Sequence, residues 1–471
     1  MKTKKPSKTR SVKTTIKLTK SYELFRKASK ILPGGVSSNA RLWATARFCP
    51  IYTPCTIFLK RARGSHVWDI DNNEYIDYRL GFGPVILGHS YPDVTKALGR
   101  AEKKGSIYGL DNELEIKVAE TIISMVPCAE MVRFSVTGTE ATMHAIRAAR
   151  AYTKKDVIVK FAGHYHGSHD YLLYSAHHTP VINLDKPYRM SEGIPKAIDN
   201  LIMVSQWNDA EEISTIMKKN HKKIAAIITE PIMGNAAGIM PQPGYLKLLK
   251  ELCDQYDSLL IFDEVKTGFR VAKGGAQELF NVTPHLTTMA KSISNGYPLS
   301  VITGQREIME MYGPGRVAQG GTYAGNPISL AATKATLQVL NKPNTYTKLN
   351  SFGTKLINGI NEIFMKNGIN VSINGVPTMF QYAIFKDVAQ PVRNYLDLSK
   401  SDADMFSKLQ YELMKQGVLV DEDYEECFYT SLSHSDADLK KTLEAFEIAV
   451  PAAKNSILTP ASRFSVKEKL R

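Results

Sequence analysis

Asp263 and Lys291 are two side chains whose types and positions favour covalent amine chemistry. Asp263 lies at the end of an apolar run, SLLIFDEV, which predicts a buried strand, and an acid in such a place is costly unless a cation meets it. Lys291 follows 28 residues later, after a second apolar stretch, among the small and apolar residues of LTTMAKSISNGYPLS. A desolvated lysine has a lowered pKa, which makes its amine a nucleophile and a carrier of protons.

An acid and a lysine of this kind match the needs of pyridoxal phosphate, a cofactor that a lysine holds as a Schiff base and whose pyridine nitrogen pairs with a carboxylate. On this hypothesis Lys291 is the covalent anchor, and Asp263 is the partner of the pyridine nitrogen. The simpler alternatives are that Asp263 forms an ordinary ion pair or cap, and that Lys291 extends its charged end toward solvent. Spacing alone leaves these alternatives open.

The segment SVTGTEATMHAIRAARAY predicts an anion site at the start of a helix. A Thr-Gly-Thr turn opens this helix, and the unpaired N–H groups there, together with the positive end of the helix dipole, suit a phosphate. Thr137 and Glu140 also match the capping box S/T-x-x-E, so helix capping is the alternative explanation. The two explanations are compatible, because the cap itself can build the site.

Tyr165 lies between two histidines in the Gly-flanked stretch KFAGHYHGSHD, after a predicted strand. Its ring is suited to stacking on a planar cofactor. His164, His166 and His169 raise a rival hypothesis, a zinc or iron hydrolase, because imidazole is the commonest metal ligand in proteins. Neither an H-E-x-x-H motif nor cysteine ligands accompany them, so we predict no metal site.

Short apolar runs alternate with amphipathic stretches from about residue 132 to 303, and this order predicts a parallel sheet. The predicted strands are DVIVKFA, NLIMVS, IAAIITEP, SLLIFDEV and LSVITG, and the helices between them include ATMHAIRAARAY and GYLKLLKELCDQY. Continuous apolar strands alternating with helices indicate a sheet that is covered on both faces. Because such sheets bind ligands at the carboxyl ends of their strands, we expect the chemical residues to meet in the loops after these runs.

The 471 residues predict two to three domains by the usual relation between length and domain number. We expect a disordered basic tail at 1–20, the first segment of a small lobe at 21–95, a large cofactor-binding domain at 96–341, the rest of the small α+β lobe at 342–458 and a C-terminal tail at 459–471. The first segment of the lobe includes a hairpin-like stretch, FLKRARGSHVWDIDNNEYIDY, with a turn at Asp-Asn-Asn.

The composition is that of an ordinary soluble globular protein, with 43% hydrophobic and 23% charged residues. The net charge of +14 is uneven, because eight Lys or Arg and no acid lie in residues 1–20, so a nucleic-acid-binding surface is not predicted. No apolar run is long enough for a membrane helix, and no secretory signal follows the basic start. The five scattered cysteines fit reduced thiols and a cytoplasmic protein.

Ordered motifs along most of the chain resemble the class III, pyridoxal-phosphate-dependent aminotransferases of fold type I, and among these the glutamate-1-semialdehyde 2,1-aminomutase branch. The matching stretches, from about residue 22 to 450, are PGGVSSNAR, VWDIDNNEYIDY, GPVILGHSYPDV, TGTEATMHAIRAAR, YHG, TEPIMGN, LLIFDEVKTGFR, GGAQELFNVTPHLTTMAK and GTYAGNP. The resemblance implies an α/β fold: a large domain with a mostly parallel seven-stranded sheet between helices, and a small α+β lobe formed by both chain ends.

The resemblance also implies the roles of residues around pyridoxal 5′-phosphate. Lys291 would hold the cofactor and move the proton between it and the substrate carbon, and Asp263 would pair with the pyridine nitrogen. The other implied cofactor contacts are Val265 against the ring, Tyr165 on its other face, Gly138 and Thr139 at the phosphate, and Asn235 beside the phenolic oxygen. Thr322 in GTYAGNP would reach the phosphate of a neighbouring subunit, which implies a homodimer with shared active sites; a local turn cap is the alternative.

On the substrate side, the resemblance places Ser38 and Arg41 where a substrate carboxylate is received, a task that suits a planar guanidinium. Surface charge in a loop is the alternative explanation for Arg41. Glu230 matches an active-site acid whose role varies in the family. Glu425 in DYEECF matches, across a one-residue gap, an acid that faces the aminomutase substrate, and Glu426 stands beside it.

Three motifs depart from the aminomutase pattern, and a longer segment, LWATARFCPIYTPCTIF, follows Arg41. The chain has GFGP at 81–84, VTGTE at 136–140 and SNGYP at 294–298, where the aminomutases have Ser-Trp-Gly-Pro, Asn-Ser-Gly-Thr-Glu and Gly-Gly-Gly-Leu-Pro. Because these changes fall at the substrate mouth and after the lysine, we predict an aminotransferase that moves an amino group from an amino-acid donor to a keto or aldehyde acceptor by a ping-pong Schiff-base mechanism. The alternative is the aminomutase itself, which transfers the amino group within one molecule and gives 5-aminolevulinate.

Overall fold

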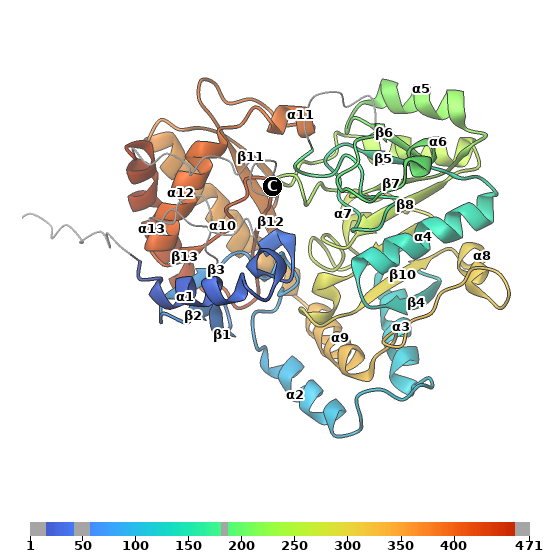
Figure 1. Ribbon diagram of the computed structural model, residues 1–471, viewed down its shortest axis with the longest axis horizontal. Helices are drawn as coiled ribbons and strands as arrows, with labels where there is room; N and C mark the ends of the chain where they lie inside the picture. Colours follow the sequence, from blue (N-terminus) through green and yellow to red (C-terminus); the bar gives the residue numbers. More distant parts are fainter. Residues whose placement is uncertain (1–15, 42–56, 180–186, 457–471) are drawn as a thin grey trace, which may run out of the picture.

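The computed structural model describes residues 16–41, 57–179 and 187–456, and these form two parts (Figure 1). One part is a large sheet with helices on its faces, drawn mainly in cyan, green and yellow. In the other part, drawn in blue, orange and red, the beginning and the end of the chain lie together. The predicted α/β class, with a sheet domain and a lobe built from both chain ends, is confirmed.

The large sheet of the described residues has seven strands and is mostly parallel, as predicted. The strands lie in the order β4-β10-β9-β8-β7-β5-β6, and β10 runs antiparallel to its neighbours β4 and β9, whereas the other neighbouring pairs are parallel. Each of the five predicted apolar runs contains one strand. The bounds are β4 (Met131–Ser135), β5 (Val157–Phe161), β6 (Ile202–Ser205), β7 (Ile224–Thr229), β8 (Leu259–Glu264), β9 (Leu286–Met289) and β10 (Ser300–Gly304).

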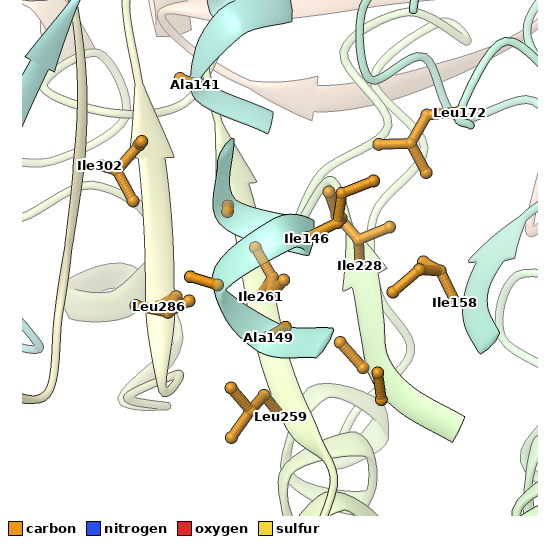
Figure 2. Close-up of a cluster of buried hydrophobic side chains, with 14 of the residues drawn as sticks. Ala141, Ile146, Ala149, Ile158, Leu172, Ile228, Leu259, Ile261, Leu286 and Ile302 are labelled. Atoms are coloured by element: carbon orange, nitrogen blue, oxygen red, sulfur yellow. The ribbon is translucent and has the colours of Figure 1, made fainter. Parts of the chain in front are cut away.

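Helices cover both faces of this sheet, which explains why its strands are continuously apolar. On one face, Ile146 of helix α4 packs in a cluster with Ile228 and Ile261 of the strands (Figure 2). The next residues back along the same strands, Ile227 and Leu260, face the opposite side and belong to a second cluster with helix α6. The helices of this part are α2 (Pro92–Glu102), α3 (Glu113–Met125), α4 (Gly138–Thr153), α5 (Ala210–Asn220), α6 (Tyr245–Gln255), α7 (Ala276–Phe280), α8 (Arg306–Met309) and α9 (Pro327–Leu340), with 3-10 helices at Lys196–Leu201, Lys291–Ser294 and Glu310–Tyr312.

Helix α4 begins where the sequence predicts, directly after β4. Thr137 is its N-cap and accepts a hydrogen bond from the backbone N–H of Glu140, whose side chain in turn accepts from the N–H of Thr137 at 2.8 Å. This capping box satisfies the N–H groups of Thr137 and Glu140, and those of Gly138 and Thr139 have no hydrogen-bond acceptor among the described residues. Five alanines and no interior glycine or proline favour the helix that follows.

The second part joins the two ends of the chain in one sheet. The order of this sheet is β1-β2-β3-β13, and β13, from the C-terminal half, pairs in parallel with β3 from the N-terminal segment. The hairpin of β2 and β3 turns around Asn72, at the predicted Asp-Asn-Asn. The elements are α1 (Thr19–Ala28), β1 (Leu59–Arg63), β2 (His66–Asp69), β3 (Glu74–Asp77), α10 (Thr345–Lys366), β11 (Asn370–Val376), β12 (Met379–Phe385), α11 (Tyr395–Leu398), α12 (Ala403–Lys415), β13 (Val418–Leu419), β14 (Phe428–Tyr429) and α13 (Asp436–Lys454), with 3-10 helices at Pro33–Gly35 and Asn39–Arg41.

Arg270 connects the two parts beside the carboxyl end of β8. Its guanidinium is fully buried and donates hydrogen bonds to the carbonyl oxygens of Gly83, Thr378 and Thr430. It also lies over the ring of Tyr429, with 5.1 Å between its Cζ and the ring centroid. Since these acceptors belong to separate segments of the lobe, Arg270 fixes the lobe against the edge of the sheet where the site is expected.

Three further predictions meet the structure outside the sheet. Helix α1 begins at Thr19, inside the stretch predicted as a tail, because both carboxylate oxygens of Asp71 accept the N–H groups of Lys20 and Ser21. Cys128, Cys253 and Cys427 are buried free thiols, and Cys49 and Cys55 lie outside the described residues. A search of the described helices finds none with the length and hydropathy needed to span a bilayer.

Candidate active site

A cavity of about 160 Å³ lies at the carboxyl ends of the central strands. Its wall is formed by the loops after β5, β7 and β8 and by the start of α4. Lys291, two residues after the end of β9, also contributes. This is the position expected for a ligand site in an open parallel sheet. The lining residues are Gly138, Thr139, Tyr165, His166, Gly167, Glu230, Asn235, Asp263, Val265, Lys266 and Lys291.

Most of the residues predicted for the site therefore meet around one cavity. Those that line it are Gly138, Thr139, Tyr165, Glu230, Asn235, Asp263, Val265 and Lys291. The predicted residues that do not line it are Ser38, Arg41, Thr322 and Glu425. The structure thus brings together the residues assigned to the cofactor within one subunit, and it separates them from those assigned to the substrate carboxylate or to a neighbouring subunit.

Lys291 presents its amine to the cavity without a hydrogen-bond partner among the residues that the structure describes. It opens the short 3-10 helix after β9, and its backbone φ of 50° is in the left-handed region, an uncommon conformation for lysine that turns the chain sharply at this point. Burial, and next the positive charge of Lys266, lower the pKa of Lys291 to about 7. Near neutral pH a large fraction of this amine is therefore uncharged and nucleophilic.

Asp263 is the acid of the cavity, and three hydrogen bonds fix it. Its Oδ2 lies 2.7 Å from Nδ1 of His166, and its Oδ1 accepts from the N–H of Val265 at 3.1 Å and from the hydroxyl of Thr288 at 3.3 Å. Burial raises the pKa of Asp263 to about 7, although the Val265 N–H and the charge of Lys291 oppose this rise. A buried carboxylate of this kind is stabilised by any cation, such as a protonated pyridine, that enters the cavity.

Glu230 and Asn235 form a hydrogen-bonded group on the wall formed by the segment after β7. Glu230 accepts from the backbone N–H of Tyr165 at 2.8 Å through Oε1 and from the amide of Asn235 at 2.9 Å through Oε2. Burial, and next the charge of Asp263, raise the pKa of Glu230 to about 7. Glu230 thus holds both the Tyr165 loop and Asn235 in place, which gives it a structural task beside any role in catalysis.

The part of the cavity at the start of α4 is shaped by two glycines. A Cβ added at Gly138 would lie 3.0 Å from Val265, and one at Gly167, where φ is 94°, would lie 2.7 Å from Cα of Thr139. Only glycine lets the two backbone segments approach this closely. The result is a narrow recess beside the free N–H groups of a helix N-terminus, which suits a phosphate. The cavity thus combines this recess with an amine, a carboxylate and an aromatic ring. Together these groups fit pyridoxal 5′-phosphate.

His166, Gly167 and Lys266 line the cavity but were not among the predicted site residues. The sequence signals for His166 and Gly167 lay in the YHG motif, where only the tyrosine was given a cofactor role. Lys266 follows Val265 directly in DEVKTGFR, and a lysine two residues after a strand is usually a solvated side chain. Its burial follows from tertiary contacts that the sequence does not display.

The predicted residues outside the cavity have other surroundings. Ser38, Arg41 and Thr322 are exposed in the single chain. Glu425 is buried, and it accepts hydrogen bonds from the hydroxyl of Tyr395 at 3.1 Å and from the backbone N–H of His178 at 3.0 Å. The roles of these four residues stay predictions.

The two histidines next to Tyr165, which raised the metal hypothesis, have hydrogen-bond partners in the protein. His164 accepts the N–H of Glu230 through Nδ1 at 3.0 Å, and His166 contacts Asp263. Within the described residues, the one group with metal-ligand spacing is His178, Asp423 and Glu425, and its short contacts are ion pairs of His178 with the two acids at 2.9 and 3.6 Å. These histidine contacts thus hold Glu230 and Asp263, two residues that line the cavity.

Comparison with known proteins identifies the family. The model of the class-III aminotransferases matches residues 49–450. Proteins named glutamate-1-semialdehyde 2,1-aminomutase are 42% identical over 436 residues in Methanosphaera stadtmanae and 40% identical over 434 residues in Thermoplasma acidophilum, in both cases over 92% of this chain and 99% of the relative.

Solved structures agree with this assignment. An omega-transaminase from Sphaerobacter thermophilus matches with a TM-score of 0.84 and 28% identity, over 92% of this chain and 98% of that one. A glutamate-1-semialdehyde aminomutase from Pseudomonas aeruginosa has a TM-score of 0.81 over 92% and 94% of the two chains, and its 21% identity shows a shared fold. The match over most of the chain shows that this protein belongs to the class III aminotransferases, enzymes whose cofactor is pyridoxal 5′-phosphate.

Proposed function

We propose that this protein is a glutamate-1-semialdehyde 2,1-aminomutase, which moves an amino group within one substrate molecule and gives 5-aminolevulinate. The observation that supports it is the 42% identity to a protein of that name across 99% of the relative's length. The motif departures favour an aminotransferase with a separate donor and acceptor, whereas the full-length relatives favour the aminomutase. An agreement that extends over the whole chain outweighs three short motifs.

An aminotransferase with a separate donor and acceptor is the second candidate. Its support is the omega-transaminase structure, which shares the fold with a TM-score of 0.84. The identity to that protein is 28%, well below the 42% to the aminomutase relative, and one fold hosts several chemistries. Identity therefore decides the order of the two candidates.

One of the motif departures, SNGYP at 294–298, also has a structural explanation. Asn295 accepts the N–H of Leu87 at 2.9 Å and donates to the carbonyl of Gly88 at 3.0 Å. The carbonyl of Gly83 accepts from Arg270 and, at 3.3 Å, from the hydroxyl of Ser292. These contacts join segment 83–88 to the turn after Lys291. A different sequence in that turn is therefore explained by its packing against segment 83–88 and needs no change of substrate.

The residues of the cavity supply the tasks that amino transfer requires. When bound, pyridoxal phosphate provides an electron sink for charge on the substrate carbon. Lys291 provides an unpaired amine that can attach the cofactor and later accept or return a proton. Asp263, held by His166, Val265 and Thr288, provides a fixed negative charge for the pyridine nitrogen. The small volume of the cavity, about 160 Å³, favours one orientation of the reacting groups.

We further propose a homodimer in which Thr322 reaches the cofactor phosphate of the neighbouring subunit. Thr322 is exposed and does not line the cavity of its own chain, which leaves it free to contact another chain. Ser38 and Arg41 are also exposed, and we assign them to the substrate carboxylate. These assignments rest on the family resemblance of their motifs.

The proposed function is tested with purified, cofactor-loaded protein and glutamate-1-semialdehyde, without an added amino donor. We expect formation of 5-aminolevulinate, because the amino group comes from the substrate itself. The variant Lys291→Ala is the control: it should fold, as shown by circular dichroism, and should lose the visible absorbance of the lysine-bound cofactor together with turnover.

The opposite result is also informative. If no 5-aminolevulinate forms, while an amino acid such as glutamate changes the cofactor spectrum to that of its aminated form, the protein is an aminotransferase with a separate acceptor. A Lys291→Ala variant with an unchanged spectrum would contradict the assignment of the lysine, whatever the substrate.

A further inference from the structure

The cavity contains a second lysine, Lys266, whose surroundings differ from those of Lys291. The side chain of Lys266 is only 4% exposed, and its Nζ lies 2.6 Å from Oε1 of Glu426 and donates to the carbonyl of Gly234 at 2.9 Å. Lys291 has no such partner among the described residues. One cavity thus holds a paired lysine and an unpaired one.

The stem of Lys266 is seated in a shaped groove. A Cβ added at Gly234 would lie 2.7 Å from Cδ of Lys266, so the absence of a side chain at Gly234 makes room for the lysine stem. The Nζ lies 5.8 Å from the ring centroid of Tyr429. The contacts with Glu426, Gly234 and Tyr429 hold the ammonium of Lys266 in place on the wall of the cavity that Lys291 also lines.

Glu426 is equally fixed on the other side of the ion pair. Besides Lys266, its Oε1 accepts from the hydroxyl of Tyr429 at 2.5 Å and from the N–H of Cys427 at 3.3 Å. Although burial opposes ionisation in both residues, the pKa of Lys266 is raised by Glu426, and the pKa of Glu426 is lowered by Lys266. Both groups therefore stay charged at neutral pH.

Burial is the largest influence on the protonation of the Lys291 amine, and four charged groups also act on it. Lys266 disfavours its protonation, whereas Glu426, Glu230 and Asp263 favour it. A cation held beside an amine is an established way to keep that amine uncharged and nucleophilic. Lys266 is the charge that opposes the three acids.

We propose that Lys266 is a positioning residue of this active site: held by Glu426, Gly234 and Tyr429, it is a fixed cation that keeps the neighbouring Lys291 side chain an uncharged amine. The inference depends on the family chemistry of Lys291, and it holds whether the substrate is glutamate-1-semialdehyde or another amine. It therefore stands apart from the proposed function, and its test uses no substrate.

Two pH titrations test the proposal, and each gives a Lys291 profile. The first follows the visible absorbance of the cofactor-loaded enzyme. The second follows the rate of Lys291 acylation in the cofactor-free full-length chain, read by peptide mass spectrometry. We expect Lys266→Met to shift the Lys291 profile upward by about one pH unit, because a like charge is removed and Glu426 is left unpaired. Glu426→Gln removes a favourable charge and leaves Lys266, so its profile should shift downward.

The opposite signs separate this role from a purely structural one. If the ion pair only joins two segments, the two variants disturb the cavity alike and shift the profile in the same direction. Lys415→Met, which breaks a largely buried ion pair with Glu412 on α12, is the matched control and should leave the profile unchanged. Shifts of opposite sign support the proposal; shifts of the same sign, or none in folded variants, overturn it. Where Lys266→Met does not fold, Lys266→Gln takes its place, with the same expected upward shift.

Discussion

At the scale of single residues, the site depends on how a few charged groups are held. Asp263 is useful only if it stays oriented and ionised when a cation enters, and a lone buried carboxylate would instead take up a proton. His166 is the closest of its three partners, at 2.7 Å. Burial lowers the pKa of His166 well below its ordinary value, so the ring is neutral and its Nδ1–H can donate to the carboxylate.

Replacing His166 by Leu should therefore weaken the site. A hydrogen bond to a charged group contributes about 1.5 to 3 kcal/mol, so we expect the affinity for pyridoxal phosphate and kcat/KM to fall roughly 10-fold to 100-fold. His166→Asn, which keeps a donor, should lose less. The measurements are equilibrium binding of the cofactor and steady-state kinetics.

Thr288→Val is the matched control for that substitution, because it removes the longest of the three hydrogen bonds, at 3.3 Å. Its loss should be smaller than that of His166→Leu. A His166→Leu enzyme that binds the cofactor as well as the wild type would show that Asp263 needs no support from this ring.

At the scale of elements, contacts between distant parts of the sequence hold the lobe together. His66, at the start of β2, lies 2.8 Å from Glu74 of β3 through Nδ1 and 2.9 Å from Asp438 of α13 through Nε2. The hydrogen bond to Asp438 and the nearby charges raise the pKa of His66, although burial opposes the rise. The protonated ring thus joins the N-terminal sheet to the C-terminal helix.

This contact predicts a pH dependence of stability. Because the pKa of His66 is higher in the folded state, its contribution is complete below the ordinary value of 6.5 and is lost as the pH rises through the raised value. The wild type should therefore exceed His66→Gln in free energy of unfolding by more at pH 6 than at pH 9. Denaturant unfolding at the two pH values measures this difference.

A difference between the wild type and His66→Gln that is the same at both pH values would mean that the His66 ring contributes by packing alone.

At the scale of the whole molecule, the single chain exposes an apolar surface next to the loop of Thr322. The exposed side chains are Ile107, Tyr108, Leu110, Ile116 and Tyr323, with Leu110 exposed to 84% and Ile116 to 62%. The amide of Asn326 donates to the carbonyl of Ser106 at 3.0 Å, which joins the two segments. Exposed apolar side chains on adjoining segments are typical of a protein interface and agree with the proposed homodimer.

The double variant Leu110→Glu/Ile116→Glu should disrupt that dimer, because two carboxylates would be buried without partners in the interface. Analytical ultracentrifugation should show monomers, and the variant should bind the cofactor more weakly, since Thr322 of the neighbour would be lost. Val388→Glu, at a residue that is also 70% exposed, is the control and should remain a dimer. A dimeric double variant would contradict this location of the interface.

Local patterns in the sequence predicted five of the seven strands of the large sheet and the start of helix α4. Apolar runs such as SLLIFDEV predicted buried strands because both faces of the sheet are covered, so that Leu260 and Ile261 must both be apolar. The capping box of Thr137 and Glu140 fixed the start of α4, because its hydrogen bonds span only four residues. Residue type and local position singled out Lys291 and Asp263, and the family motifs pointed to the same two residues.

By itself, the sequence determined the fold class, the family and the residues whose signals are local. Only the tertiary structure decided that Lys266 is a buried partner of Glu426, 160 residues away, and that His166 supports Asp263, 97 residues away. It also placed Glu426, and not Glu425, in contact with the cavity wall. The physical reason is that burial and charge pairing depend on which distant segments the fold brings together, and a lysine or histidine carries no local mark of the partner it will meet.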